Sequence, residues 1–170
     1  MTVRHFDPRK NYRNVLIGRW EYLVDENGVV LKGIWGRKGA EGSSQDGVES
    51  GTDLILMDPG SAFPLHTHPG DHHLYCQSGS GIVHIGGAGY RFETGITVFV
   101  AAELPHSVRN VSPNLTLVFI AVGHPHIALD SPRRMRYVAE DHPSCRECGT
   151  IMVRNGSHFK CLNCGATPGR

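Results

Sequence analysis

The stretch Gly60-Ser-Ala-Phe-Pro-Leu-His66-Thr-His68-Pro-Gly-Asp-His72-His73-Leu-Tyr-Cys-Gln-Ser-Gly79 concentrates histidines at spacings that suit a metal site. On a β-strand, alternate side chains point to the same face, so His66 and His68 project together. His72 falls on the same parity if the strand resumes after the Pro69-Gly70-Asp71 turn. We therefore predict that these three imidazoles face one site.

A second stretch, Leu104-Pro105-His106-Ser-Val-Arg-Asn110, supplies a fourth candidate ligand, His106, on a further strand entered through a proline. Short apolar runs separated by glycine-containing turns surround both stretches, at residues 52–57, 82–85, 90–93, 97–100 and 115–122. Short strands at this regular spacing predict a sandwich or a barrel.

The two stretches carry a family resemblance. The pattern Gly60-x5-His66-x-His68-x3-His72-x6-Gly79 resembles the first motif of the cupin superfamily, and Pro105-His106-x3-Asn110 resembles the end of the second. The resemblance implies an all-β fold, a jelly-roll cupin β-barrel with His106 as the last metal ligand. It also implies that Asn110 supports a turn by hydrogen bonds, and that the protein is a homodimer.

The chain departs from the cupin pattern at three positions. His72 stands where the family usually has glutamate, Thr94 where it usually has proline, and Glu103 where glycine is common. The first departure gives an all-histidine set of candidate metal ligands in the barrel, namely His66, His68, His72 and His106.

Four neutral imidazoles would leave the positive charge of a bound ion uncompensated. The two-histidine, one-carboxylate arrangement typical of iron oxygenases is absent from this pattern. Histidine ligands with an open position allow Zn²⁺ to polarise a carbonyl or acidify a water. We therefore predict redox-neutral Lewis-acid chemistry on a small-molecule substrate: cyclisation, elimination or rearrangement, as in polyketide cyclases or cupins that form nitrogen–nitrogen bonds.

Two other functions fit the same residues. All-histidine cupins that use Fe²⁺ as dioxygenases exist, and Mn, Ni or Cu are further candidates for the barrel ion. A non-catalytic barrel that binds or senses a small molecule is the third hypothesis.

Near its C-terminus the chain carries two Cys-x-x-Cys knuckles, each followed by glycine: Cys145-Arg-Glu-Cys148-Gly149 and Cys161-Leu-Asn-Cys164-Gly165. This spacing matches a tetrahedral Cys₄ site and resembles a zinc ribbon, in which the Zn²⁺ is structural. Rubredoxin-like iron and disulfides are the competing interpretations.

Candidate catalytic side chains are few. Cys76 shares the parity of His72 and should point into the barrel, as an apolar filler or as a reactive thiol. Glu103 precedes the His106 strand and could lie near the barrel mouth. His73 should point outward. His84 and the pair His124 and His126 are not expected to bind the ion, although a place at the mouth is open for that pair.

We expect four parts along the chain: an arm (1–14), the cupin barrel (15–128), a linker (129–143) and the small zinc ribbon (144–167). Asn27-Gly28 between apolar runs predicts a β-hairpin. Residues 37–51 are rich in glycine and serine and read as a long loop, either a surface excursion or a lid over the barrel.

Composition excludes some partners. The 170 residues carry a formal net charge of +1, which gives no electrostatic reason to expect a nucleic acid as partner. No run approaches the ~18 apolar residues of a membrane span, and the N-terminal residues lack the apolar core of a signal peptide. We therefore expect a cytoplasmic protein with no membrane partner.

Overall fold

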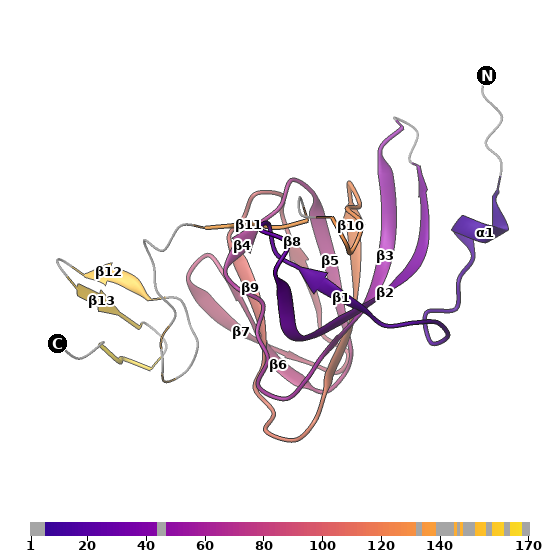
Figure 1. The fold of residues 1–170 in the computed structure, drawn as a ribbon. Helices are drawn as coiled ribbons and strands as arrows, with labels where there is room; N and C mark the ends of the chain where they lie inside the picture. The colour runs from indigo at the N-terminus through magenta and orange to yellow at the C-terminus, as the bar shows by residue number, and fades with distance from the viewer. Residues whose placement is uncertain are drawn as a thin grey trace.

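The computed structural model describes residues 6–43, 47–131, 134–138, 145, 147, 152–155, 158–161 and 164–167. Within them, two antiparallel sheets form a β-barrel, and a separate hairpin follows toward the C-terminus (Figure 1). The first sheet has the order β1-β2-β3-β10-β5-β8: Glu21–Val24, Val30–Ser43, Glu49–Met57, Leu117–His124, Asp71–Ser78 and Thr97–Val100. The second has the order β11-β4-β9-β6-β7: Arg136–Tyr137, His66–Thr67, His106–Asn110, Ser80–Ile85 and Ala88–Glu93. The all-β prediction is confirmed.

The interior of the barrel is one apolar core built from inward-facing residues of both sheets. Leu23, Ile34, Ile55 and Phe119 come from the first sheet, and Phe92 comes from the second. Phe92 and Phe119 meet edge to face across the core, with their ring centroids 5.5 Å apart. Burial of these side chains holds the sheets face to face and leaves one end of the barrel for the histidines.

The predicted hairpin at Asn27-Gly28 is confirmed. β1 pairs with β2 antiparallel, and the Asp25 carboxylate accepts hydrogen bonds from the backbone amides of Asn27 and Val29. Gly28 takes a φ of +77°, a left-handed conformation that glycine adopts without steric cost.

The predicted loop at residues 37–51 is wrong. β2 continues to Ser43 and pairs with β3 from Glu49, so the described part of this segment is mostly a long hairpin. Two of its glycines lie where the chain is crowded: a Cβ on Gly39 would lie 2.6 Å from the Thr52 carbonyl oxygen, and one on Gly51 would lie 2.5 Å from the His126 ring. These glycines permit close packing within a strand, which the composition alone does not distinguish from a loop.

The predicted linker at 129–143 also needs correction. Its described part includes β11, which pairs with β4, and Leu129 and Met135 are buried in the barrel core. Tyr137 donates a hydrogen bond of 2.7 Å from its hydroxyl to Asp25, which ties β11 to the first hairpin. The barrel therefore continues past residue 128, as far as the described residues 134–138.

The ends of the chain contribute smaller elements. Helix α1 (Pro8–Asn11) lies in the predicted arm, and the Asn11 side chain donates to the Glu41 carbonyl of β2. Toward the C-terminus, β12 (Val153–Asn155) and β13 (His158–Lys160) form the antiparallel hairpin of the predicted ribbon. Within the described residues, no helix has the length and hydropathy that crossing a bilayer requires.

Candidate metal centre

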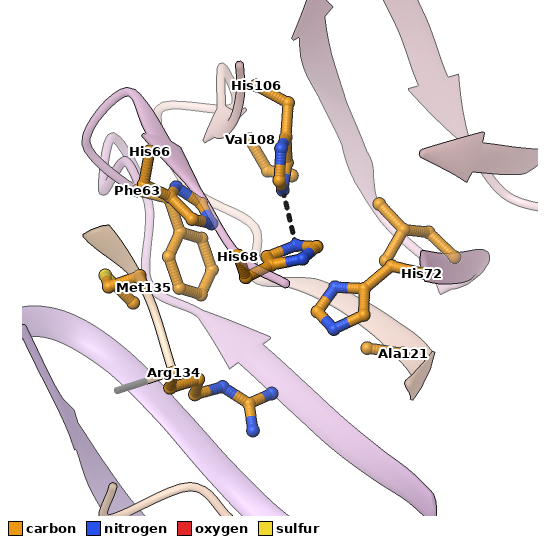
Figure 2. A pocket seen from close by; sticks show the side chains of 10 residues that line it. Phe63, His66, His68, His72, His106, Val108, Ala121, Arg134 and Met135 are labelled. Atoms are coloured by element: carbon orange, nitrogen blue, oxygen red, sulfur yellow. Dashed lines mark hydrogen bonds between the residues drawn. The ribbon is translucent and has the colours of Figure 1, made fainter. Parts of the chain in front are cut away.

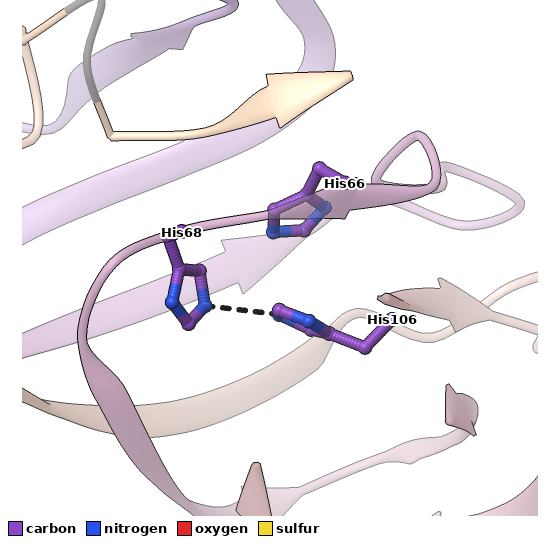
Figure 3. Close-up of side chains that lie close together, drawn as sticks. All are labelled: His66, His68 and His106. Carbon is purple, nitrogen blue, oxygen red and sulfur yellow. Dashed lines mark hydrogen bonds between the residues drawn. The ribbon is translucent and has the colours of Figure 1, made fainter. Parts of the chain in front are cut away.

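Three histidines converge at one end of the barrel (Figure 3). His66 lies on β4, His68 follows that strand by one residue, and His106 opens β9, where it is paired directly with His66. All three side chains are buried, and one ring nitrogen from each falls in a group whose members all lie within 4.8 Å of one another. We call these residues the histidine cluster.

The backbone fixes which nitrogen of each ring faces the cluster. The Nδ1 atoms of His66, His68 and His106 lie 2.8, 2.6 and 2.8 Å from the carbonyl oxygens of Pro64, Gly70 and Leu104. A carbonyl can only accept, so each Nδ1 carries the proton and donates it. Each Nε2 is then left with a lone pair, the form that binds a metal ion.

One contact inside the cluster shows that it suits a cation. The Nε2 atoms of His68 and His106 lie 3.1 Å apart, the contact drawn as a dashed line in Figure 3. A hydrogen bond between these two atoms would need a proton on one Nε2. If the ring stayed neutral, its Nδ1 would lose its proton and face a carbonyl oxygen with no hydrogen to donate; if Nδ1 kept its proton, the buried ring would be charged. A metal ion held by both Nε2 lone pairs would satisfy the two nitrogens without moving either proton. The cluster therefore fits a metal ion.

Burial keeps these rings neutral. Removal from water lowers the pKa of His106 to about 4, with the Leu104 carbonyl opposing that shift and the charge of His68 adding to it. Burial likewise lowers the pKa of His66 well below its ordinary value and lowers the pKa of His68. At neutral pH the imidazoles are therefore in the state that coordinates metal.

His72 faces the same cavity, but it does not join the compact group of donors. It comes from β5 in the opposite sheet, and its ring stacks on His68 with centroids 3.8 Å apart and an interplanar angle of 35°. Figure 2 shows it on the side of His68 away from His66 and His106. Burial is the main cause that lowers the pKa of His72, and the nearby His68 and Arg134 lower it further. The structure thus brings three of the four predicted barrel ligands together and places the fourth beside them.

The two candidate catalytic residues do not line this cavity. Cys76 is fully buried in the apolar core, where burial raises the pKa of its thiol, as expected of a packing residue. Glu103 is exposed and pairs with Arg136 at the surface. As predicted, His73 is exposed, stacking on Phe99. His84 is buried near Ser107 and away from the cavity.

Sequence reasoning missed a buried ion pair next to the cluster. Arg134 lines the cavity, and its Nη1 donates to Asp53 at 2.9 Å and to the Ile127 carbonyl at 2.7 Å. His126 places its Nε2 3.1 Å from the same Asp53 oxygen. The sequence signal that points to this group is the His124-x-His126 pair, for which a position at the barrel mouth is one interpretation.

The cysteines form a second candidate metal group. Cys145, Cys161 and Cys164 bring their sulfurs within 4.8 Å of one another, and none of these three cysteines is in a disulfide. The Cys164 amide lies 3.5 Å from the Cys161 sulfur, and Gly165 takes a φ of +77°, as the knuckle geometry requires. The predicted fourth ligand, Cys148, lies outside the described residues.

Comparisons with known proteins agree with this geometry. Residues 53–123 match the family described as the cupin domain. The barrel has the cupin fold. A cupin-2 domain protein of Rhodospirillum rubrum is similar in structure, with a TM-score of 0.56 at 17% identity over 81% of this chain and 86% of that one.

Two further solved structures share the cupin fold. KdgF of a Halomonas species gives a TM-score of 0.53 at 18% identity, over 65% of this chain and 88% of that one. The polyketide cyclase RemF of Streptomyces resistomycificus gives 0.50 at 21% identity, over 65% and 75%. No curated protein matches the chain.

Two positions of the second cupin motif, Glu103 and Asn110, can be compared with the structure. Glu103, where the family often has glycine, takes a φ of +61°, a region that disfavours side chains with a Cβ. Asn110 is fully buried and, as predicted, supports a turn: its Nδ2 donates to the carbonyls of Met57, Asp58 and Leu115, and its Oδ1 accepts from the Ser112 amide.

Proposed function

We propose that this protein is a metal-dependent cupin enzyme that carries out redox-neutral Lewis-acid chemistry on a small molecule. The carrying observation is the histidine cluster, in which three neutral imidazoles turn their Nε2 lone pairs toward one point. Bound Zn²⁺ would supply a positive charge that polarises a carbonyl or acidifies a water. Cyclisation, elimination and rearrangement all use that chemistry.

The lining of the cavity argues against one class of iron oxygenase. Among the described residues that line the cavity, none is aspartate or glutamate. The iron oxygenases of the two-histidine, one-carboxylate class depend on such a ligand. The polyketide cyclase among the structural neighbours shares the fold only, but it makes ring closure a reasonable first reaction to test.

His72 is the side chain we assign to proton transfer. Its ring lines the cavity, burial keeps it neutral, and no hydrogen bond to another described residue occupies its nitrogens. Burial makes this imidazole a weak base, so we assign it a proton only from a substrate beside His68 that a bound metal ion would acidify. The usual cupin glutamate would have occupied this position.

The test is turnover by zinc-loaded protein under nitrogen, with small carbonyl compounds, including linear polyketide thioesters, as trial substrates. We expect product without O₂, loss of activity on treatment with a chelator, and recovery when Zn²⁺ is restored. Activity that requires both Fe²⁺ and O₂ would overturn the proposal in favour of a dioxygenase. Substrate binding without turnover under any metal would favour a non-catalytic barrel.

We propose further that the cysteine cluster, with Cys148, holds a structural Zn²⁺. Among the described residues of this segment, the apolar side chains packed around the cluster are Met152, Phe159 and Ala166, so we expect the ion to contribute much of the folding free energy. Removal of zinc should therefore abolish the protection of the β12–β13 amides from hydrogen exchange. Unchanged protection in metal-free protein would rule out this role.

A further inference from the structure

Arg134 is a buried cation in a cavity otherwise lined by neutral groups. Its residue is 7% exposed, and it shares the cavity with His66, His68 and His72 and with apolar side chains such as Phe63 and Met135. Figure 2 shows its side chain passing below His68 in that view, with the guanidinium directed toward the cavity. It lies beyond the residues that match the cupin domain, in the segment expected to be a linker.

Only some of the hydrogen-bond donors of this guanidinium have a partner among the described residues. Nη1 is bonded to Asp53 and to the Ile127 carbonyl, whereas Nε and Nη2 have no hydrogen-bond partner among the described residues. Arginine presents five N–H donors in a planar fork, so several remain available to a ligand.

The arginine is held in place before any ligand arrives. Asp53 is 1% exposed, and its Oδ2 contacts both Arg134 Nη1 and His126 Nε2. A charged side chain with this support loses little conformational freedom when it binds a ligand.

Charge balance indicates what the ligand is. Asp53 offsets Arg134, the histidine cluster is neutral, and a divalent ion would add two positive charges that no described residue lining the cavity offsets. A buried, uncompensated charge is costly, so a bound anion is favoured. Guanidinium groups bind carboxylates with particular strength and geometry.

The volume of the cavity limits the size of the anionic group that it can hold. The cavity volume is about 30 Å³, room for about two water molecules. A carboxylate group is of that size, and the rest of a larger substrate would extend toward the mouth.

We infer that Arg134 is the anion-binding residue of this cavity, and that the substrate is a small carboxylate held by its guanidinium beside the histidine cluster. This inference rests on the proposed function for its metal ion. It assigns a substrate-specificity role to a residue outside both cupin motifs.

The test is acetate binding to the full chain, with the cysteine cluster filled by zinc and Co²⁺ in the barrel. The visible absorption of the barrel cobalt is the part of the wild-type spectrum that is missing from the spectrum of His106→Ala. We expect acetate to perturb that absorption, and Arg134→Gln to weaken acetate binding on the order of tenfold or more. Imidazole, a neutral metal ligand, should bind wild type and Arg134→Gln equally.

A matched control lies two residues away. Arg136→Gln removes the same charge from the same segment, but that side chain is at the surface and pairs with Glu103. Its acetate affinity should equal that of wild type. Arg134→Gln removes the arginine partner of Asp53 and leaves that buried carboxylate with His126. The double variant Asp53→Asn with Arg134→Gln replaces the ion pair by a neutral pair of amides, in case the single variant does not fold, and it should show the same loss of acetate binding.

The outcomes separate the two proposals. Wild-type acetate affinity in the Arg134 variants, with the cobalt spectrum intact, overturns the inference and leaves the metal site standing. A wild-type spectrum identical to that of His106→Ala means that the barrel takes no cobalt, and the proposed function fails. In that case, titration calorimetry with acetate tests the inference about Arg134 without the metal. The inference requires that wild type and Arg136→Gln release heat on binding acetate and that Arg134→Gln does not.

Discussion

The same local arrangement orients each imidazole of the histidine cluster. A backbone carbonyl two residues away in sequence accepts the Nδ1 proton, from Pro64 for His66, from Gly70 for His68 and from Leu104 for His106. The proton position on each ring therefore follows from its own chain segment. Such fixed ligands raise affinity because little ordering remains to be done on binding.

Removal of one clustered ring should therefore remove the barrel ion. We expect His106→Ala to reduce the metal content of gently purified protein from two ions per chain to one, because two imidazoles remain. Elemental analysis measures this directly. His73→Ala is the matched control, since that ring is exposed on the same strand as His72, and its metal content should stay at two. Equal metal content in both variants would contradict the assignment.

His72 should separate metal binding from turnover. We expect His72→Gln to retain the barrel ion while turnover falls by about 100-fold, the usual cost of losing a general acid or base. Metal content and steady-state rates are compared on the same preparation. If His72→Gln lost the ion as His106→Ala does, His72 would be a fourth ligand and not a proton carrier.

The histidine cluster also makes the metal-free protein sensitive to acid. Burial lowers the folded-state pKa of His106 from 6.5 to about 4, so between these values the unfolded chain binds the extra proton. This contribution to the free energy of unfolding is complete above pH 6.5 and is lost as the pH falls toward 4, up to about 3 kcal/mol. Calorimetry of metal-free protein should show an unfolding temperature that falls over this range. The fall should be shallower in His106→Gln; the same slope in both would show that other groups cause it.

At the level of elements, the barrel depends on Asn110 to join three backbone segments. This side chain at the end of β9 is the hydrogen-bond donor for the end of β3 and for the turn that leads into β10. Its function is structural, since it contacts neither the histidine cluster nor the cavity.

Loss of this amide should cost stability without affecting the metal. We expect Asn110→Ala to lower the free energy of unfolding by about 2–4 kcal/mol, because buried carbonyls lose their partners. Urea denaturation gives the change, and metal content is measured on the folded fraction. Asn114→Ala, a change of the same kind at an exposed position in the same turn, should have little effect. A stability loss below 1 kcal/mol for Asn110→Ala would contradict this role.

The elements that sequence predicted best are those governed by local patterns. Alternation along the strands placed His66 and His68 on one face, and Asn27-Gly28 identified the first hairpin, because both signals depend on near neighbours. Residues 37–51 misled because their glycines serve contacts with Thr52 and His126, which no local pattern records.

The whole molecule contains features that arise only when distant segments meet. Asp53 and Arg134 are separated by 81 positions, and a segment with prolines and charges after β10 reads as a linker until that ion pair is seen. His72 was placed correctly in the cavity by parity, but its distance from the cluster depends on how the opposite sheet packs. The homodimer expected from the cupin resemblance remains a prediction.

Two candidate metal groups on one chain, one of imidazoles and one of thiols, define the molecule as a whole. The most direct test is anomalous X-ray scattering at the zinc edge from a crystal of zinc-loaded protein. The account predicts a peak in the barrel ~2.0–2.1 Å from the Nε2 atoms of His66, His68 and His106. A peak at the cysteine cluster alone, with the three imidazoles holding no zinc, would contradict it.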